Sequence, residues 1–344
     1  MIKNVRCQIN RETSYTCLSS NNISKRVLEQ DIAGIHKTIN SIPRLSFNIS
    51  QNADVRDQSI EIAGLAVQAM LYEVSCHPSP GLVTRASLGA HQDMDYFTFL
   101  DSVSALIHPL IYCAEAGFSL STPKEVFQKI RLIGQIGEQR MFQKTSGVNT
   151  HKGMLFLLGV CCAAGGKALY NGLSFSSLQG IIQEMTEDLV EEELCSRLIE
   201  FQNSDQSTLT HGERLYLNYR IEGIRGEVQR GLPIVFGFAL QFYKDQKGLS
   251  QNLRLVQTLL AIMQYCEDSN VLHRHTPKTL QEVQNQAKHI LSMGGVTTAQ
   301  GMNALEVMAE DFAKRRISPG GSADLLGVTV FLYFLEKYMK KARP

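Results

Sequence analysis

Apolar residues recur at intervals of three and four along most of this 344-residue chain, which is the spacing of one buried face of an α-helix. Segments with this pattern lie at 60–74, 94–111, 122–141, 153–170, 178–201, 212–223, 232–247, 249–266, 277–293, 298–314 and 323–338. Segment 153–170 is apolar on nearly all sides, which predicts a central buried helix. Long alternating β-branched runs between turn residues are absent from the sequence, so the pattern predicts an all-α fold, a multi-helix globular bundle.

Residues 1–55 differ from the rest of the chain because they are rich in Asn, Ser and Thr and contain one amphipathic candidate helix, at 24–39. We interpret 1–55 as an N-terminal arm or small appended subdomain and 56–344 as a helical catalytic domain. Within that domain, Thr122 and Glu125 flank Pro123 as a capping box with proline at the first helical position, which predicts a helix start there.

The 34 basic and 33 acidic residues nearly cancel, leaving a net charge of +1. We therefore expect neither nucleic acid nor an anionic membrane as the main partner. The longest uncharged apolar run, 153–166, is shorter than the about 20 residues of a membrane span. The N-terminus lacks a secretory signal, and the eight cysteines form no Cys-x-x-Cys pair, so the sequence predicts a cytoplasmic protein with reduced thiols.

A dense polar cluster lies where a loop enters the helix predicted at 94–111. His91 and Asp95 are four residues apart, with Asp93 beside the first turn. Free N–H groups at a helix start attract anions and carboxylates suit a divalent cation, so a polyphosphate bridged by Mg²⁺ fits this place. Capping of the helix by Asp93 explains the same pattern without a ligand.

Three further polar turns carry candidate chemistry. Lys152 at the start of the buried helix favours a nearby anion, or it is a solvent-facing lysine beside a Thr150 cap. Arg225 suits phosphate oxygens and Glu227 a sugar hydroxyl, unless both pair with charges elsewhere. Paired glycines at 320–321 allow close approach to a phosphate, although Gly-Gly-Ser also caps ordinary helices. The acidic run at 184–193 is interpreted as a solvated helix face.

Five motifs follow one another along the chain: Gly-Leu-Val at 81–83 with 89–95, then 147–153, 225–227, Asn270 with 272–274, and 318–326. In this order they resemble the signatures of the triphosphoribosyl-dephospho-coenzyme A synthases, the prosthetic-group family of citrate lyase and malonate decarboxylase. The resemblance covers about residues 55–340. Thr84 departs from it, because the family pattern has an Asp at that place.

The resemblance implies a helical transferase that moves the 5-triphosphoribosyl group of ATP to the 2′-hydroxyl of 3′-dephospho-coenzyme A and releases adenine. The change from a β-linked to an α-linked product implies one inverting displacement without a covalent enzyme intermediate. The product is the prosthetic-group precursor that a separate holo-acyl-carrier-protein transferase attaches. Oligomeric state is left open by the sequence, with a homodimer as one arrangement.

Roles for individual residues follow as hypotheses from this resemblance. The expected Mg²⁺ ligands are Asp93, Asp95 and Asp324. The expected phosphate contacts are Lys152 and Arg225, followed by Arg85 and Arg274. The expected general base on the 2′-hydroxyl is Glu227, and the proton donor to adenine is His151 or His91. The groups expected to orient the ligand are Asn149 and the backbone of Gly320 and Gly321.

Two other classes of protein remain open at this point. A helical His/Asp metal phosphohydrolase would use the same residue types, for example His91, Asp93, Asp95, His151 and His211, but the strict His-Asp doublet of such enzymes is missing. A helical interaction module, in which the polar turns are only caps, predicts no thermal stabilisation by ATP with Mg²⁺.

Overall fold

The computed structural model describes residues 53–196 and 209–342, and these ranges are helical almost throughout. All described residues belong to one compact unit of the chain, Ser50–Pro344. The candidate helix at 24–39 lies outside the described residues. No strand occurs in the described part, where the only β-type pairing is an isolated bridge between Thr84 and Ser87, so the all-α prediction is confirmed.

Four long helices form the centre of the described unit: α2 (Ala53–Val74), α3 (Tyr96–Gly117), α4 (Pro123–Lys144) and α5 (Lys152–Tyr170). All residues from 154 to 168 are buried except Phe156, which confirms the predicted central helix. Helices α3 and α5 approach closely because Gly117 and Gly166 lie at their crossing. A Cβ at either glycine would overlap a backbone carbonyl oxygen of the other helix, at Ala163 or Ala114.

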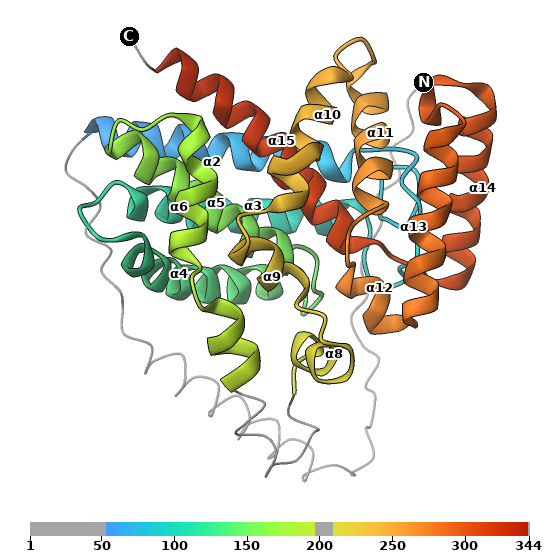
Figure 1. Ribbon diagram of the computed structural model, residues 1–344, viewed down its shortest axis with the longest axis horizontal. Coiled ribbons are helices and arrows are strands. Elements are labelled where there is room, and N and C mark those ends of the chain that lie inside the picture. The colour runs from blue at the N-terminus through green and yellow to red at the C-terminus, as the bar shows by residue number, and fades with distance from the viewer. Residues whose placement is uncertain (1–52, 197–208, 343–344) are drawn as a thin grey trace, which may run out of the picture. The chain divides into compact units, whose positions relative to one another are not determined.

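Further helices surround this centre. They are α6 (Leu178–Met185), α8 (His211–Tyr219), α9 (Gly223–Gln229), α10 (Leu240–Asp245), α11 (Gln251–Met263), α12 (Ser269–Arg274), α13 (Pro277–Ser292), α14 (Ala299–Arg315) and α15 (Gly320–Lys341). Shorter turns are η1 (Phe175–Ser177), η2 (Glu191–Cys195), η4 (Val235–Ala239) and η5 (Gly295–Thr297). Helix α15 packs on α2 and α5, while α13 and α14 stand side by side (Figure 1).

Helix boundaries follow local sequence signals in most places. The predicted capping box is present: the Thr122 side chain accepts the Glu125 N–H, and the Glu125 carboxylate accepts the Thr122 N–H. Segment 178–201, predicted as one helix, is interrupted after Met185 because Asp188 adopts a left-handed backbone with φ of 64°. Segment 212–223 ends early at Arg220, which is also left-handed.

The polar turn at 267–275 contains a short helix that the sequence did not predict. Asp268 caps α12 by accepting the N–H groups of Asn270 and Val271. A run of six helical residues is too short for apolar periodicity to reveal it, so the cap is its main sequence signal.

Helices α3 and α5 are long and apolar enough by composition to cross a membrane. In α5 the most apolar window is 78% buried inside the bundle, as in a core helix of a globular protein, whereas the corresponding value for α3 is 39%. The two helices pack against each other within the unit.

Candidate active site

A cavity of about 460 Å³ lies between α4, α5, α9 and α12 and also receives side chains from α8, η2 and α15. Its volume falls in the range of pockets that hold small-molecule ligands. Apolar side chains such as Phe127, Phe156 and Ile224 form part of its wall, and charged side chains, uncharged polar side chains and glycines form the rest. An apolar wall with a few convergent charges is typical of a ligand site.

Three cations line the cavity, and each is held by a glutamate. Lys152 Nζ lies 2.6 Å from Glu138 Oε1. Glu193 bridges two arginines, with Oε1 2.6 Å from Arg131 Nη2 and Oε2 2.6 Å from Arg225 Nε. These pairs fix the cations at the cavity wall without removing their charge.

Asp324 brings a carboxylate from the first turns of α15 to the beginning of α5. The Met154 N–H donates to it, and a Cβ at Gly153 would overlap one of its oxygens, so glycine is required for this approach. Burial raises the pKa of Asp324 well above its ordinary value, and the nearby carboxyls of Glu73 and Asp268 raise it further. Among the described residues no cation forms an ion pair with Asp324, unlike the glutamates at 138, 193 and 222.

Motif segments that are distant in sequence, together with residues next to them, contact one another at the cavity and beside it. Their contacts form a chain: His91 Nε2 lies 2.9 Å from Ser318 Oγ, Gly320 lies against the Asn270 amide, Asp324 against Gly153, Gly223 against Ser269, and Arg225 against Gly212. The glycines leave space for each neighbouring side chain, which is a physical reason for the Gly content of the motifs.

Four of the predicted site residues line the cavity: Asn149, Lys152, Arg225 and Asp324. Asn149 accepts the Lys152 N–H through Oδ1 at 3.3 Å, so it satisfies the first N–H group of α5 at the cavity wall. Lys152 already has an anionic partner within the protein, because its Nζ pairs with Glu138.

Two residues predicted to move protons do not line the cavity. Glu227 is buried on α9, where its Oε1 accepts the Ile234 N–H at 2.8 Å, and burial raises the pKa of its carboxyl. His151 is buried beside Ser102, 2.8 Å from Nδ1 to Oγ, and burial lowers its pKa to about 3. Both side chains are held by neighbours in the bundle.

The loop before α3 lies beside the end of α12 and also does not line the cavity. Asp95 is exposed and caps α3 by accepting the Thr98 N–H at 2.8 Å, and this bond lowers the pKa of Asp95. Asp93 Oδ1 lies 3.8 Å from His91 Nδ1, which is too long for a hydrogen bond. Burial lowers the pKa of His91, and the charge of Arg274 lowers it further. Arg85 is exposed on the same loop.

Thr84, the departure from the family pattern, is buried and caps a turn of this loop. Its Oγ1 accepts the N–H groups of Ala86 and Ser87 at 3.2 and 3.1 Å. An aspartate carboxylate at this position could accept the same two N–H groups.

The buried carboxylate of Asp268 binds the first N–H groups of α15. Asp268 accepts the N–H of Gly321 at 3.1 Å and both the N–H and the hydroxyl of Ser322 at 2.8 and 2.9 Å. Gly320 packs on Asn270, which lines the cavity. The Gly-Gly pair therefore permits tight packing on the turn at 268–270, and the Gly321 N–H is already used inside the protein.

Sequence reasoning missed several charged residues of the cavity: Arg131, Glu138, Glu193 and Glu222. Arg131 and Glu138 are seven residues apart and share one face of α4, which the helical period alone could have shown. An ordinary solvent-facing side of a helix shows the same spacing. Only the packing of α5 and α9 around the cavity distinguishes a cavity wall from such a surface.

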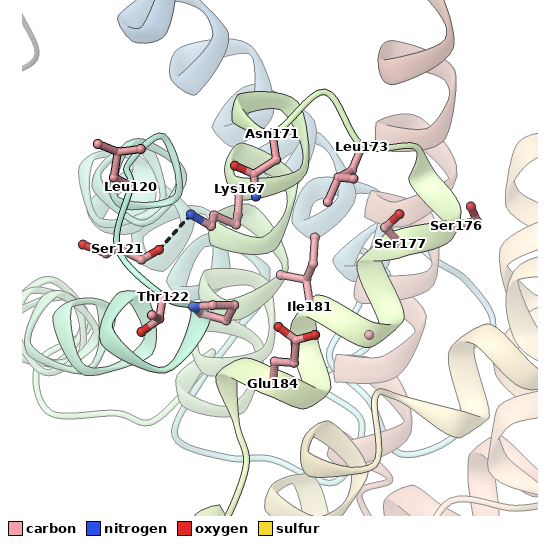
Figure 2. Close-up of a pocket in the computed structure, with 12 residues that line it drawn as sticks. Leu120, Ser121, Thr122, Lys167, Asn171, Leu173, Ser176, Ser177, Ile181 and Glu184 are labelled. Carbon is pink, nitrogen blue, oxygen red and sulfur yellow. Dashed lines mark hydrogen bonds between the residues drawn. The ribbon is translucent and has the colours of Figure 1, made fainter.

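A different hollow of about 610 Å³ lies between the starts of α4 and α6 and the end of α5 (Figure 2). Lys167 lies within it but donates from Nζ to the carbonyls of Ser119 and Ser121, both at 2.7 Å. None of the predicted site residues lines this hollow. Lys167 therefore serves a structural role, because it satisfies backbone carbonyls of the segment between α3 and α4. The cavity of about 460 Å³ is the better candidate for the active site.

No group of three or more His, Cys, Asp or Glu side chains positioned to hold a metal ion occurs in the described part of the chain. Of the three predicted Mg²⁺ ligands, Asp324 lines the cavity and the two carboxylates of the 91–95 loop do not. A phosphohydrolase centre built from clustered histidines and aspartates is not formed by the described residues.

Comparison with known proteins assigns the family. The sequence profile of CitG, described as ATP:dephospho-CoA triphosphoribosyl transferase, matches residues 59–343. The chain belongs to this family. The match includes every motif on which the resemblance was based and all residues that line the cavity described above.

The names of similar proteins are consistent with the CitG family. The chain is 39% identical over 274 residues to the "Probable 2-(5''-triphosphoribosyl)-3'-dephosphocoenzyme-A synthase" of Lactiplantibacillus plantarum, covering 79% of this chain and 95% of that protein. It is 38% identical to a protein of the same name from Vibrio cholerae, covering 81% and 89%. It is 35% identical to "Protein CitXG" of Leuconostoc mesenteroides, covering 95% and 68%. No solved structure matches the chain.

Proposed function

We propose that this cavity is the active site in which the chain transfers the 5-triphosphoribosyl group of ATP to the 2′-hydroxyl of dephospho-coenzyme A, with release of adenine. The observation that carries the proposal is the convergence of Lys152, Arg225 and Asp324, which come from three separate motifs, on one cavity. The reaction keeps the triphosphate and breaks a glycosidic bond. It therefore needs cations for the phosphates and a carboxylate near the sugar.

The cations are spread along the cavity, as an extended triphosphate requires. Arg131 and Glu138, the partner of Lys152, are seven residues apart on α4, which corresponds to about 10 Å of helix. Lys152 lies next to Gly153 and hence to Asp324. We place the ribose near Asp324, the first phosphate near Lys152 and the later phosphates toward Arg225, with apolar side chains such as Phe156 available to the purine.

Asp324 is the carboxylate best suited to accept the proton of the 2′-hydroxyl. It lines the cavity and has no cationic partner among the described residues. In its ionised form, a carboxylate with a raised pKa holds the hydroxyl proton more tightly than an ordinary aspartate does. Glu227, the residue predicted for this role from the sequence, accepts a backbone N–H away from the cavity lining.

Protonation of the leaving adenine was assigned to His151 or His91. Burial lowers the pKa of both imidazoles, so the charged form that donates a proton is disfavoured at neutral pH. The cavity wall includes another imidazole, His273 on α12, which we propose as the proton donor in their place.

Mg²⁺ is commonly held by one or two carboxylates together with substrate phosphates. The described residues do not form a three-carboxylate cage, so Mg²⁺ would be carried into the cavity by the triphosphate, where its charge would offset that of the phosphates. The residues of the chain then bind and orient the polyphosphate and move the hydroxyl proton.

We further propose that the protein acts in the cytoplasm, where its product is passed to a holo-acyl-carrier-protein transferase. All six cysteines of the described ranges are free thiols, as in proteins of reducing compartments. A homodimer remains our proposal for the assembly.

The test is to incubate the protein with ATP, Mg²⁺ and dephospho-coenzyme A and to measure adenine and the triphosphoribosylated adduct by mass. Asp324→Asn should lower kcat by about 10²- to 10⁴-fold with little change in KM for ATP. Glu227→Gln is the matched comparison and should retain most of the activity. The reverse result, with Glu227→Gln inactive and Asp324→Asn active, would mean that Glu227 on α9 is the general base. Formation of ADP or AMP without adenine would overturn the reaction itself.

A further inference from the structure

We propose that Arg131 is a second phosphate-binding residue and that Glu193 is a positioning residue, which holds Arg131 and Arg225 together as a two-arginine seat for the far end of the triphosphate. The inference rests on the proposed function and deepens it. Neither Arg131 nor Glu193 belongs to the motifs that identify the family by sequence, and Glu193 lies in the acidic run interpreted above as a solvated face.

The geometry is a bridge with one carboxylate oxygen on each guanidinium. Glu193 Oε1 is 2.6 Å from Arg131 Nη2, and Oε2 is 2.6 Å from Arg225 Nε. The side chains are 40% exposed for Arg131, 22% for Glu193 and 29% for Arg225, so the group is partly buried at the cavity wall. The unit carries two positive charges and one negative charge, which leaves a net positive charge facing the cavity.

Each guanidinium keeps donors for a ligand. An arginine has five N–H donors, and the bridge uses one nitrogen on each side chain. The remaining edges suit phosphate oxygens, which arginine forks bind with charge-assisted hydrogen bonds. Two guanidinium groups on the same carboxylate repel each other. The negative charge of Glu193 offsets this repulsion and allows the two arginines to lie side by side.

Neighbouring groups restrict where both arginines lie. The Arg131 guanidinium lies over the Phe127 ring, 5.8 Å from its centroid. Arg225 Nη1 lies so close to Gly212 that a Cβ there would stand 2.8 Å away. The first turn of α8 is thus shaped to accept the guanidinium of α9, and both cations are positioned before a ligand arrives.

The backbone explains why Glu193, among the acidic residues around it, turns inward. It lies in the π-helical turn η2, a wider turn that is frequent at functional sites. Glu191 bonds instead to the Gln229 amide at 3.2 Å, and Glu192 lies 3.8 Å from Lys124. The three consecutive glutamates therefore have three different partners, and only Glu193 reaches the cavity lining.

Binding of inorganic tripolyphosphate, measured by calorimetry, tests the seat without requiring turnover. Arg131→Ala should weaken tripolyphosphate binding and raise KM for ATP by about 10- to 100-fold, the loss of one or two charge-assisted hydrogen bonds. KM for dephospho-coenzyme A should not change. Arg131→Lys should recover part of the loss. Arg140→Ala, an exposed arginine of the same helix outside the cavity lining, is the matched control and should behave as the unaltered protein.

Glu193→Gln tests whether Glu193 positions the two arginines or only adds a negative charge that competes with the ligand. If Glu193 holds the pair, the variant binds tripolyphosphate more weakly and has a higher KM for ATP, with kcat and melting temperature retained. Tighter binding of tripolyphosphate by the variant would mean that Glu193 only competes with the ligand, and would overturn its positioning role. Unchanged binding by Arg131→Ala would overturn the seat, while adenine release by the unaltered protein would show that the proposed function still holds.

Discussion

Gly153→Ala is the substitution that most directly tests the arrangement of the site, because it inserts one methyl group between α5 and Asp324. A Cβ at Gly153 would overlap Asp324 Oδ2, far inside the 3.0 Å that real Cβ atoms keep. The overlapped atom belongs to a short aspartate side chain on another long helix. Asp324 must therefore withdraw from the start of α5.

Two opposing effects determine how Gly153→Ala changes the free energy of unfolding. Withdrawal leaves the Met154 N–H without the carboxyl oxygen that accepts it, a loss of about 1 to 3 kcal/mol. Replacing glycine by alanine in a helix restores roughly 0.5 to 1 kcal/mol. We expect a net destabilisation of about 1 to 2 kcal/mol, which in a domain of this size lowers the melting temperature by about 2 to 6 °C.

The matched control is Gly64→Ala, an exposed position in the middle of α2 where a Cβ would meet no atom within 4 Å. It should stabilise the protein slightly. Thermal unfolding followed by circular dichroism compares the two variants, and adenine release should fall only in Gly153→Ala. Equal melting temperatures for the two variants would refute the placement of Asp324 against α5.

Further outcomes follow from the charged groups around α5 and α15. Lys152→Ala should raise KM for ATP by about 10- to 100-fold in the adenine-release assay, and an unchanged KM would remove Lys152 from the phosphate site. Burial raises the pKa of Glu73 from 4.5 to about 8, so between these pH values the native chain keeps a proton that the unfolded chain has released. This group should make the unfolding free energy fall by up to about 1.4 kcal/mol per pH unit from pH 5 to 8. Glu73→Gln should therefore flatten that decline in urea titrations, and parallel pH profiles would contradict it. Asp268→Asn should lower the unfolding free energy by about 2 to 4 kcal/mol. One carboxylate oxygen accepts from Ser322 and the other accepts the N–H groups of Gly321, Asn270 and Val271, whereas an amide has a single acceptor oxygen and would turn its NH₂ group toward one of these sets of donors. A normal urea midpoint would argue against these contacts.

Helix positions were predictable because they depend on neighbours in the sequence. The apolar period identified α5 as the central helix, and the Thr122 capping box placed the start of α4, since both signals act within one or two turns. The breaks near Asp188 and Arg220 were missed, because left-handed residues other than glycine depend on the surrounding packing.

The candidate site was predictable only in part, for a related reason. Polar motifs drew attention to Lys152, Arg225 and Asp324, and the fold brings these three to one cavity. The same reasoning favoured Asp95, which caps α3 outside the cavity lining, because a capping carboxylate and a ligand-binding carboxylate look alike in sequence. Glu193 was assigned to solvent, although it joins two arginines from α4 and α9.

The sequence by itself determined the helical class, the central helix and the order of the motifs, since periodicity and caps are local properties. Tertiary structure alone decided which charges share a cavity. Ion pairs such as Arg131 with Glu193, and glycine contacts such as Gly153 with Asp324, join residues tens to hundreds of positions apart, and their geometry depends on how whole helices pack.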